Sequence, residues 1–202
     1  FGHETLKEFA DYSSVPVING LSDSYHPCQV LSDLLTISER GIDLDSLSVA
    51  YVGDGNNVCH SWILAAGVLD FRLKVATPED YRPRKDVFER AISRNPKIAW
   101  MSDPHEAVRE AHVIYTDVWA SMGQEDEAEA RRRAFEPYQV NAKLLESAPK
   151  DALVMHCLPA HRGEEITEDV IEGPRSIVFD QAENRMHLQK ALLVYLLKGF
   201  MP

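Results

Sequence analysis

Residues 48–57 read Ser-Val-Ala-Tyr-Val-Gly-Asp-Gly-Asn-Asn and carry the strongest structural signal in the chain. The first five residues form a short apolar, β-branched run, which is typical of a buried strand. A glycine-rich turn follows at 53–57, and an apolar helical pattern then covers 58–69. A strand, a tight turn and a helix in this order predict the first unit of a parallel α/β sheet.

The same alternation extends in both directions from this unit. Further strands are expected at 73–77, 98–101, 113–116, 152–156 and 176–179. Further helices are expected at 28–40, 84–93, 104–111, 125–135, 140–147 and 186–198. The predicted fold class is therefore α/β, with one main domain built on a doubly wound, mainly parallel, Rossmann-like sheet that has helices on both faces.

Composition and charge restrict the partners of the chain. Its 202 residues are 45% hydrophobic and 26% charged, which predicts a folded globular protein. The net charge of -11 disfavours nucleic acid as a partner. No apolar run approaches the ~20 residues of a membrane span, so no membrane partner is expected. Three cysteines without a C-x-x-C spacing indicate a reducing compartment, and we expect a cytoplasmic location. The histidines lack the paired spacing of a zinc site, so no metal is expected.

Polar residues follow several of the expected strands, where ligands bind in an open parallel sheet. Asp117 either caps the next turn or is a counter-ion for a cationic amine. Cys157 is either a small core residue or an active thiol. Of Asn56 and Asn57, one is expected to cap the following helix, and the other suits the carboxylate and ammonium groups of an amino acid.

Three further segments have two interpretations each. His26 and Gln29 lie on one face of the first turn of an expected helix, so they either cap it or hydrogen-bond a carbonyl oxygen and an amide. The Gly53-x-Gly55 turn raises a dinucleotide interpretation, but Val58 stands where the third glycine belongs. Residues 119–133 form a polar insertion, which is most simply a solvated loop and helix.

Together these motifs resemble the ornithine carbamoyltransferases over nearly all 202 residues. In family order they are His26-Pro27-Cys28-Gln29, Gly53-Asp54-Gly55-Asn56-Asn57, Asp117-Val118-Trp119 with Ser121-Met122-Gly123-Gln124-Glu125, His156-Cys157-Leu158-Pro159, and Phe179-Asp180-Gln181-Ala182-Glu183-Asn184-Arg185. The resemblance implies transfer of a carbamoyl group from carbamoyl phosphate to the side-chain amine of L-ornithine. The products would be L-citrulline and phosphate, and no metal or organic cofactor would take part.

The resemblance also implies roles for single residues. Ornithine would be bound by Asn57, Asp117, Ser121, Met122 and Cys157. Carbamoyl phosphate would be contacted by His26, Gln29, Leu158 and Arg185. The catalytic set would be His26, Asp117, Cys157 and Arg185. The segment 121–133 resembles the loop that closes over ornithine, with Arg131, Arg132 and Arg133 left as a solvated face.

The match stops at the family's Ser-x-Arg-Thr-Arg phosphate loop, which is absent from these residues. We therefore expect a fragment: 1–40 as the tail of the carbamoyl phosphate domain with a connecting helix, 41–184 as the ornithine-binding domain, and 185–202 as a helix that packs back on the missing domain. Such a fragment should have little activity alone, and the complete enzyme should be a homotrimer-based assembly. The same site serves arginine biosynthesis and arginine breakdown.

Two other functions remain open from the sequence. One is a non-catalytic amino-acid-binding module, and the other is a nucleotide-binding Rossmann domain. The last expected helix should also expose an apolar patch, made by Leu192, Leu193, Leu196 and Leu197.

Overall fold

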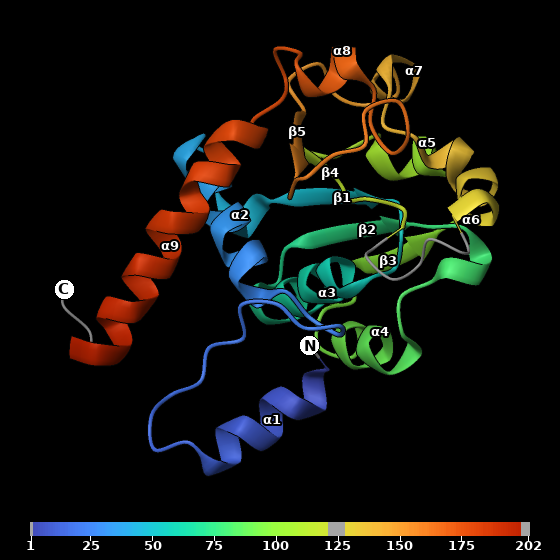
Figure 1. Cartoon of the computed structure of the whole chain (residues 1–202). Coiled ribbons are helices and arrows are strands. Elements are labelled where there is room, and N and C mark those ends of the chain that lie inside the picture. The colour runs from blue at the N-terminus through green and yellow to red at the C-terminus, as the bar shows by residue number, and fades with distance from the viewer. Residues whose placement is uncertain (1, 121–127, 199–202) are drawn as a thin grey trace.

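The computed structural model describes residues 2–120 and 128–198. Within them, one sheet of five strands has the order β3-β2-β1-β4-β5 (Figure 1). The strands are β1 (Ser48–Val52), β2 (Arg72–Ala76), β3 (Ile98–Met101), β4 (Val113–Thr116) and β5 (Leu153–His156). All neighbouring pairs are parallel. The order reverses between β1 and β4, as in a doubly wound sheet, so the predicted α/β fold is confirmed.

Helices cover both faces of the sheet (Figure 1). One face carries α3 (Asn57–Leu69) and α4 (Lys85–Ile92), with α2 (Pro27–Glu39) at the end of that layer and α9 (Val178–Lys198) packed on α2. The other face carries α5 (Pro104–Val108), α6 (Ala128–Phe135), α7 (Ala142–Leu145) and α8 (Glu168–Ile171). Short 3-10 helices lie at Leu44–Ser46, Glu79–Tyr81 and Glu136–Tyr138. The N-terminal α1 (His3–Tyr12) buries none of its residues.

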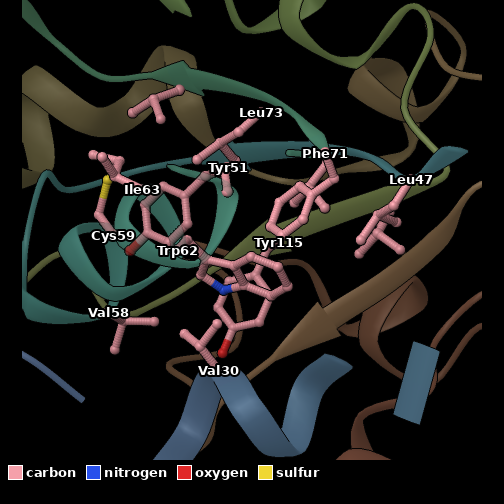
Figure 2. Close-up of a cluster of buried hydrophobic side chains, with 14 of the residues drawn as sticks. Val30, Leu47, Tyr51, Val58, Cys59, Trp62, Ile63, Phe71, Leu73 and Tyr115 are labelled. Atoms are coloured by element: carbon pink, nitrogen blue, oxygen red, sulfur yellow. The ribbon is translucent and has the colours of Figure 1, made fainter. Parts of the chain in front are cut away.

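The strand side chains alternate between two hydrophobic cores. From β1, Tyr51 enters the core beneath α3, whereas Ala50 enters the core beneath α5. The Tyr51 ring stacks on Tyr115 with 5.8 Å between centroids, and Trp62 meets Tyr115 edge-on at 5.2 Å. Figure 2 shows Val30 of α2 pointing into the same cluster. The two strands at the reversal point, β1 and β4, are thus fixed against α2 and α3.

The predicted strand at 176–179 is wrong. Ser176 forms only an isolated bridge with Val154, and α9 already begins at Val178, eight positions before the predicted start. The Gln181 N–H donates to the Ile177 carbonyl oxygen, which forms the first helical turn. Ile177 and Val178 are buried and β-branched, which is compatible both with a strand and with the start of a buried helix. A short apolar run is too short to show the periodicity that separates the two.

The turn after β1 depends on its two glycines. Gly53 has φ 139°, a conformation that residues with a Cβ rarely adopt. A Cβ on Gly55 would lie 2.3 Å from the backbone nitrogen of Pro83, so only glycine fits there. The turn thus packs directly against the backbone of residues 81–83, and α3 begins two residues after Gly55. Among the helices of residues 2–120 and 128–198, none combines the length and hydropathy that crossing a bilayer requires.

Candidate active site

Polar side chains meet at the carboxyl ends of β1, β4 and β5, beside the point where the strand order reverses. Asp117, directly after β4, accepts a hydrogen bond from Cys157 Sγ at 3.0 Å and one from the Val118 N–H at 2.8 Å, both on Oδ1. Its Oδ2 accepts from Asn56 Nδ2 at 2.7 Å. Only 7% of Asp117 is exposed. The structure therefore joins Asp117 and Cys157 by a hydrogen bond in a largely buried polar cluster, which also includes Asn56.

The two neighbouring asparagines have different contacts. Asn56 is the N-cap of α3, because its Oδ1 accepts from the N–H groups of Val58 and Cys59, while its amide donates to Asp117. Asn57, the predicted ornithine ligand, donates from Nδ2 to the Ser22 carbonyl oxygen at 2.8 Å. Asn56 thus caps α3 and also contacts Asp117, which the sequence did not predict. The available signal was that capping uses only the side-chain oxygen and leaves the amide free.

Cys157 is a neutral thiol in this environment. Burial raises the pKa of the Cys157 thiol well above its ordinary value, and the Asp117 carboxylate raises it further. Cys157 Sγ donates a hydrogen bond to Asp117 Oδ1, so the thiol is the donor of the pair and the carboxyl group is the acceptor.

A second group of predicted residues lies where α2 meets α9. Arg185 of α9 donates from Nη1 to Gln29 Oε1, and the same nitrogen lies 3.5 Å from His26 Nε2. Burial lowers the pKa of His26 to about 4, and the Arg185 guanidinium acts in the same direction. The Asp117 carboxylate acts in the opposite direction on that pKa, so both groups lie within electrostatic reach of each other. At neutral pH the imidazole is uncharged.

The β5 end is held by His156 and its neighbours. His156 is fully buried, and its Nδ1 accepts from the Leu158 N–H at 2.8 Å while Nε2 lies 3.0 Å from Glu165 Oε1. These contacts fix the ring orientation and leave Nε2 as the protonated nitrogen. Leu158, predicted to contact carbamoyl phosphate, has φ 57° and precedes a cis peptide bond to Pro159.

Asp117, His156 and Cys157 also bring three potential metal-ligating atoms within 4.8 Å, which their sequence spacing did not indicate. Both nitrogens of the His156 ring already have protein partners, however. In this conformation the imidazole has no nitrogen available for a metal.

Arg131 corrects the prediction for the polar insertion. It is only 4% exposed, pairs with Asp54 of the turn after β1, and lies with its guanidinium carbon 4.6 Å from the centre of the Tyr81 ring. The prediction of a solvated arginine run is therefore wrong for Arg131, whereas Arg132 and Arg133 are exposed. A run of charged residues does not indicate which of its members is buried, because this depends on how the helix packs against the rest of the protein. The predicted ligands Ser121 and Met122 lie outside the described residues.

One buried carboxyl group was not singled out from the sequence. Asp33 Oδ1 accepts from Gln29 Nε2 and from Gln181 Nε2, each at 2.8 Å. Burial raises the pKa of Asp33 to about 7. Its i,i+4 spacing from Gln29 was the signal that could have suggested the pair.

Comparison with known proteins gives a consistent family. Residues 45–196 match the model described as the Asp/Orn binding domain of aspartate/ornithine carbamoyltransferase, and residues 1–39 match its carbamoyl-P binding domain. An ornithine carbamoyltransferase of Methanoculleus marisnigri is 55% identical over 100% of this chain and 65% of its own length. The relative from Pseudomonas aeruginosa, named as anabolic, is 56% identical over 98% of this chain and 64% of its own length.

A solved ornithine carbamoyltransferase from Pyrococcus furiosus superposes with a TM-score of 0.94 and 51% identity, covering 100% of this chain and 66% of that one. The chain thus spans slightly less than two thirds of the length of the relatives that it matches.

Proposed function

Because the chain belongs to the aspartate/ornithine carbamoyltransferase family, we propose that it supplies the ornithine site and part of the carbamoyl phosphate site of an ornithine carbamoyltransferase. The complete enzyme would transfer the carbamoyl group to the side-chain amine of L-ornithine, with L-citrulline and phosphate as products. The named relatives favour ornithine over aspartate as the acceptor.

The observation that carries this proposal is the hydrogen-bonded cluster of Asp117, Cys157 and Asn56 at the reversal point of the sheet. A buried carboxylate with a neutral thiol beside it suits a cationic amine, because the charge is matched and the thiol sulfur is a further polar contact. A second carboxylate, as in aspartate, would be repelled there. The amine would donate to Asp117 in place of the thiol of Cys157 and the amide of Asn56.

The chemistry requires the amine to lose a proton. An amine of this type has an unperturbed pKa near ~10.4, so at neutral pH it is protonated and not nucleophilic. In the proposed reaction its nitrogen forms a bond to the carbamoyl carbon, the carbon–oxygen bond to phosphate breaks, and phosphate leaves with the electron pair. Of the two protons that the ammonium nitrogen loses, one ends on the phosphate and the other is released to solvent. Asp117 would hold the cation in place until the proton leaves, and positioning of the two substrates would supply much of the rate.

The group formed by His26, Gln29 and Arg185 would bind the carbamoyl end of carbamoyl phosphate. The Arg185 guanidinium and a neutral His26 imidazole can both donate hydrogen bonds to a carbonyl oxygen on which negative charge develops. Leu158 would contact the same substrate from the end of β5. Asn57, Ser121 and Met122 would hold the α-amino and carboxylate groups of ornithine.

The rest of the assignment follows from the family. We propose that residues 1–40 continue a carbamoyl phosphate domain, that 41–184 form the ornithine domain, and that 185–202 pack back on the first domain. The complete enzyme would be a cytoplasmic, trimer-based assembly. By likeness to the relative named anabolic, we propose a role in arginine biosynthesis.

The test is calorimetric titration of the 202-residue chain with L-ornithine, with and without carbamoyl phosphate, beside a citrulline assay. We expect ornithine to bind and L-aspartate not to bind, with no steady formation of citrulline. An Asp117→Asn variant should lose ornithine binding, whereas Asp103→Asn, at an exposed helix cap, should retain it. Equal binding of ornithine and aspartate, or binding that survives Asp117→Asn, would overturn the proposed ornithine site.

A further inference from the structure

A chain of buried amide contacts connects the two halves of the site. On one side of Asp33, Gln29 donates to its Oδ1 and presents Oε1 to Arg185. On the other side, Gln181 donates to the same oxygen at 2.8 Å and accepts from the His156 N–H at 3.0 Å. Asp33 is completely buried, and both glutamines are 1% exposed. One carboxyl oxygen therefore leads to Arg185 in one direction and to the end of β5 in the other.

Asp33 Oδ1 is the one partner that both amides share, and it helps to set the direction of each. A glutamine side chain has a donor end and an acceptor end, and nothing but its partners decides which end points where. Because Asp33 Oδ1 accepts from both NH2 groups, each NH2 group faces it and each carbonyl oxygen faces away. The Gln29 oxygen then meets the Arg185 guanidinium, and the Gln181 oxygen meets the backbone of the residue before Cys157. A reversed amide would oppose donor to donor at both places.

We propose that Asp33 is a positioning residue. It acts through Gln29 on Arg185 and through Gln181 on the end of β5 next to Cys157, and so holds these two groups in a fixed relative position. The inference rests on the proposed function for what these two groups bind. The required feature is an acceptor oxygen at this position and not the charge, because a carboxyl or amide oxygen receives the same two bonds.

A competing explanation is that Asp33 merely ties α2 to α9. The same helices share a second polar contact, in which Asn184 Nδ2 donates to Thr36 Oγ1 at 3.0 Å. Thr36 is fully buried and lies one helical turn after Asp33. Thr36→Val is therefore a matched control, since it removes a buried contact between α2 and α9 that involves neither Gln29 nor Gln181.

The experiment records the side-chain amide resonances of the 15N-labelled chain by NMR. The amide of Asn95, which donates to the carbonyl oxygens of Ala66 and Phe71, is the internal reference. We expect Asp33→Leu to shift the signals of both Gln29 and Gln181 while that of Asn95 stays. Asp33→Asn keeps an acceptor oxygen and should leave both signals in place, as should Thr36→Val. The backbone spectrum of each variant reports whether it is folded.

Titration with carbamoyl phosphate provides the functional measurement. We expect Asp33→Leu to weaken the binding of carbamoyl phosphate about tenfold, because Gln29 would lose its acceptor and would no longer hold the Arg185 guanidinium in place. Asp33→Asn should bind carbamoyl phosphate as the unaltered chain does. The proposal fails if Asp33→Leu moves neither glutamine signal, if Asp33→Asn behaves like Asp33→Leu, or if Thr36→Val moves the signals equally. If the unaltered chain binds neither substrate, the proposed function fails, while the amide signals still decide the role of Asp33.

Discussion

At the scale of single residues, Asp117 receives hydrogen bonds on both oxygens from Cys157, Val118 and Asn56. In Asp117→Asn one oxygen becomes an amide donor and must face one of these donors. We expect the free energy of unfolding to fall by about 1–3 kcal/mol, the usual result of an unsatisfied buried polar group. Urea unfolding followed by circular dichroism measures this change.

Asp103→Asn is the matched control for that measurement. The exposed Asp103 carboxylate accepts from the His105 N–H at 2.8 Å, and asparagine caps helices equally well. We expect its effect to stay below about 0.5 kcal/mol. Similar losses of stability in both variants would contradict the contacts assigned to Asp117.

The carboxyl group of Asp33 predicts a pH dependence of stability. Its pKa in the folded chain is raised from 3.8 to about 7 by burial, against the opposing influence of Gln29, Gln181, Tyr115 and Arg185. Folding thus favours the protonated form, so this stabilisation is complete below about pH 4 and is lost as pH rises through about 7. Relative to Asp33→Asn, which does not titrate there, the chain should lose on the order of a few kcal/mol over this range. A pH-independent difference between the two unfolding free energies would refute the raised pKa.

The chemical character of the site could be partly predicted from single residues. The position of Asp117 directly after an apolar strand indicated a polar group at the carboxyl end of the sheet. The structure places this carboxyl group in contact with Cys157. The capping role of Asn56 left its amide free, but the identity of Asp117 as the partner depends on which strands are neighbours in the sheet. The spacing of Asp33 from Gln29 was a local signal, whereas its contact with Gln181, 148 positions away, had none.

At the scale of elements, the buried pair of Arg131 and Asp54 joins α6 to the turn after β1. The side chains are 5% and 10% exposed, so loss of one partner leaves an uncompensated buried charge. We expect Arg131→Leu to lower the free energy of unfolding by about 3–5 kcal/mol. In the double variant with Asp54→Asn the loss should be smaller than the sum of the single losses. Thermal and denaturant unfolding of the four proteins gives this comparison.

Arg133 offers the control on the same helix. It pairs with Glu129, but both side chains are 79% exposed. Because exposed pairs contribute little, Arg133→Leu should change stability by less than about 1 kcal/mol. Equal effects of Arg131→Leu and Arg133→Leu would show that α6 is not anchored through Asp54.

Prediction of the elements succeeded where burial is complete on both sheet faces. Strands such as β1 and β4 are buried at every position, and they read as continuous apolar runs in the sequence. The run at 176–179 has the same composition, yet its last two residues begin α9. The strands β1 and β4 differ from the run at 176–179 in having a neighbouring strand along their length. This difference depends on the tertiary structure and cannot be derived from the local sequence.

At the scale of the whole molecule, the chain is about two thirds as long as its relatives, and the later part of α9 is apolar and exposed. Leu193, Leu196 and Leu197 are 49%, 38% and 82% exposed, in agreement with the predicted patch. Leu192 is half-buried. An apolar surface of this kind favours association, since water is released when it is covered.

We therefore expect the mean mass of the purified chain, measured by light scattering after size-exclusion chromatography, to rise with protein concentration. Leu197→Glu should keep the chain monomeric to higher concentration, because it places a charge at the most exposed leucine of the patch. Ala182→Glu adds the same charge to an exposed position near the start of the helix and should not alter the association. If Ala182→Glu dissociates the chain as well as Leu197→Glu does, general charge repulsion explains the effect and α9 is not the contact surface.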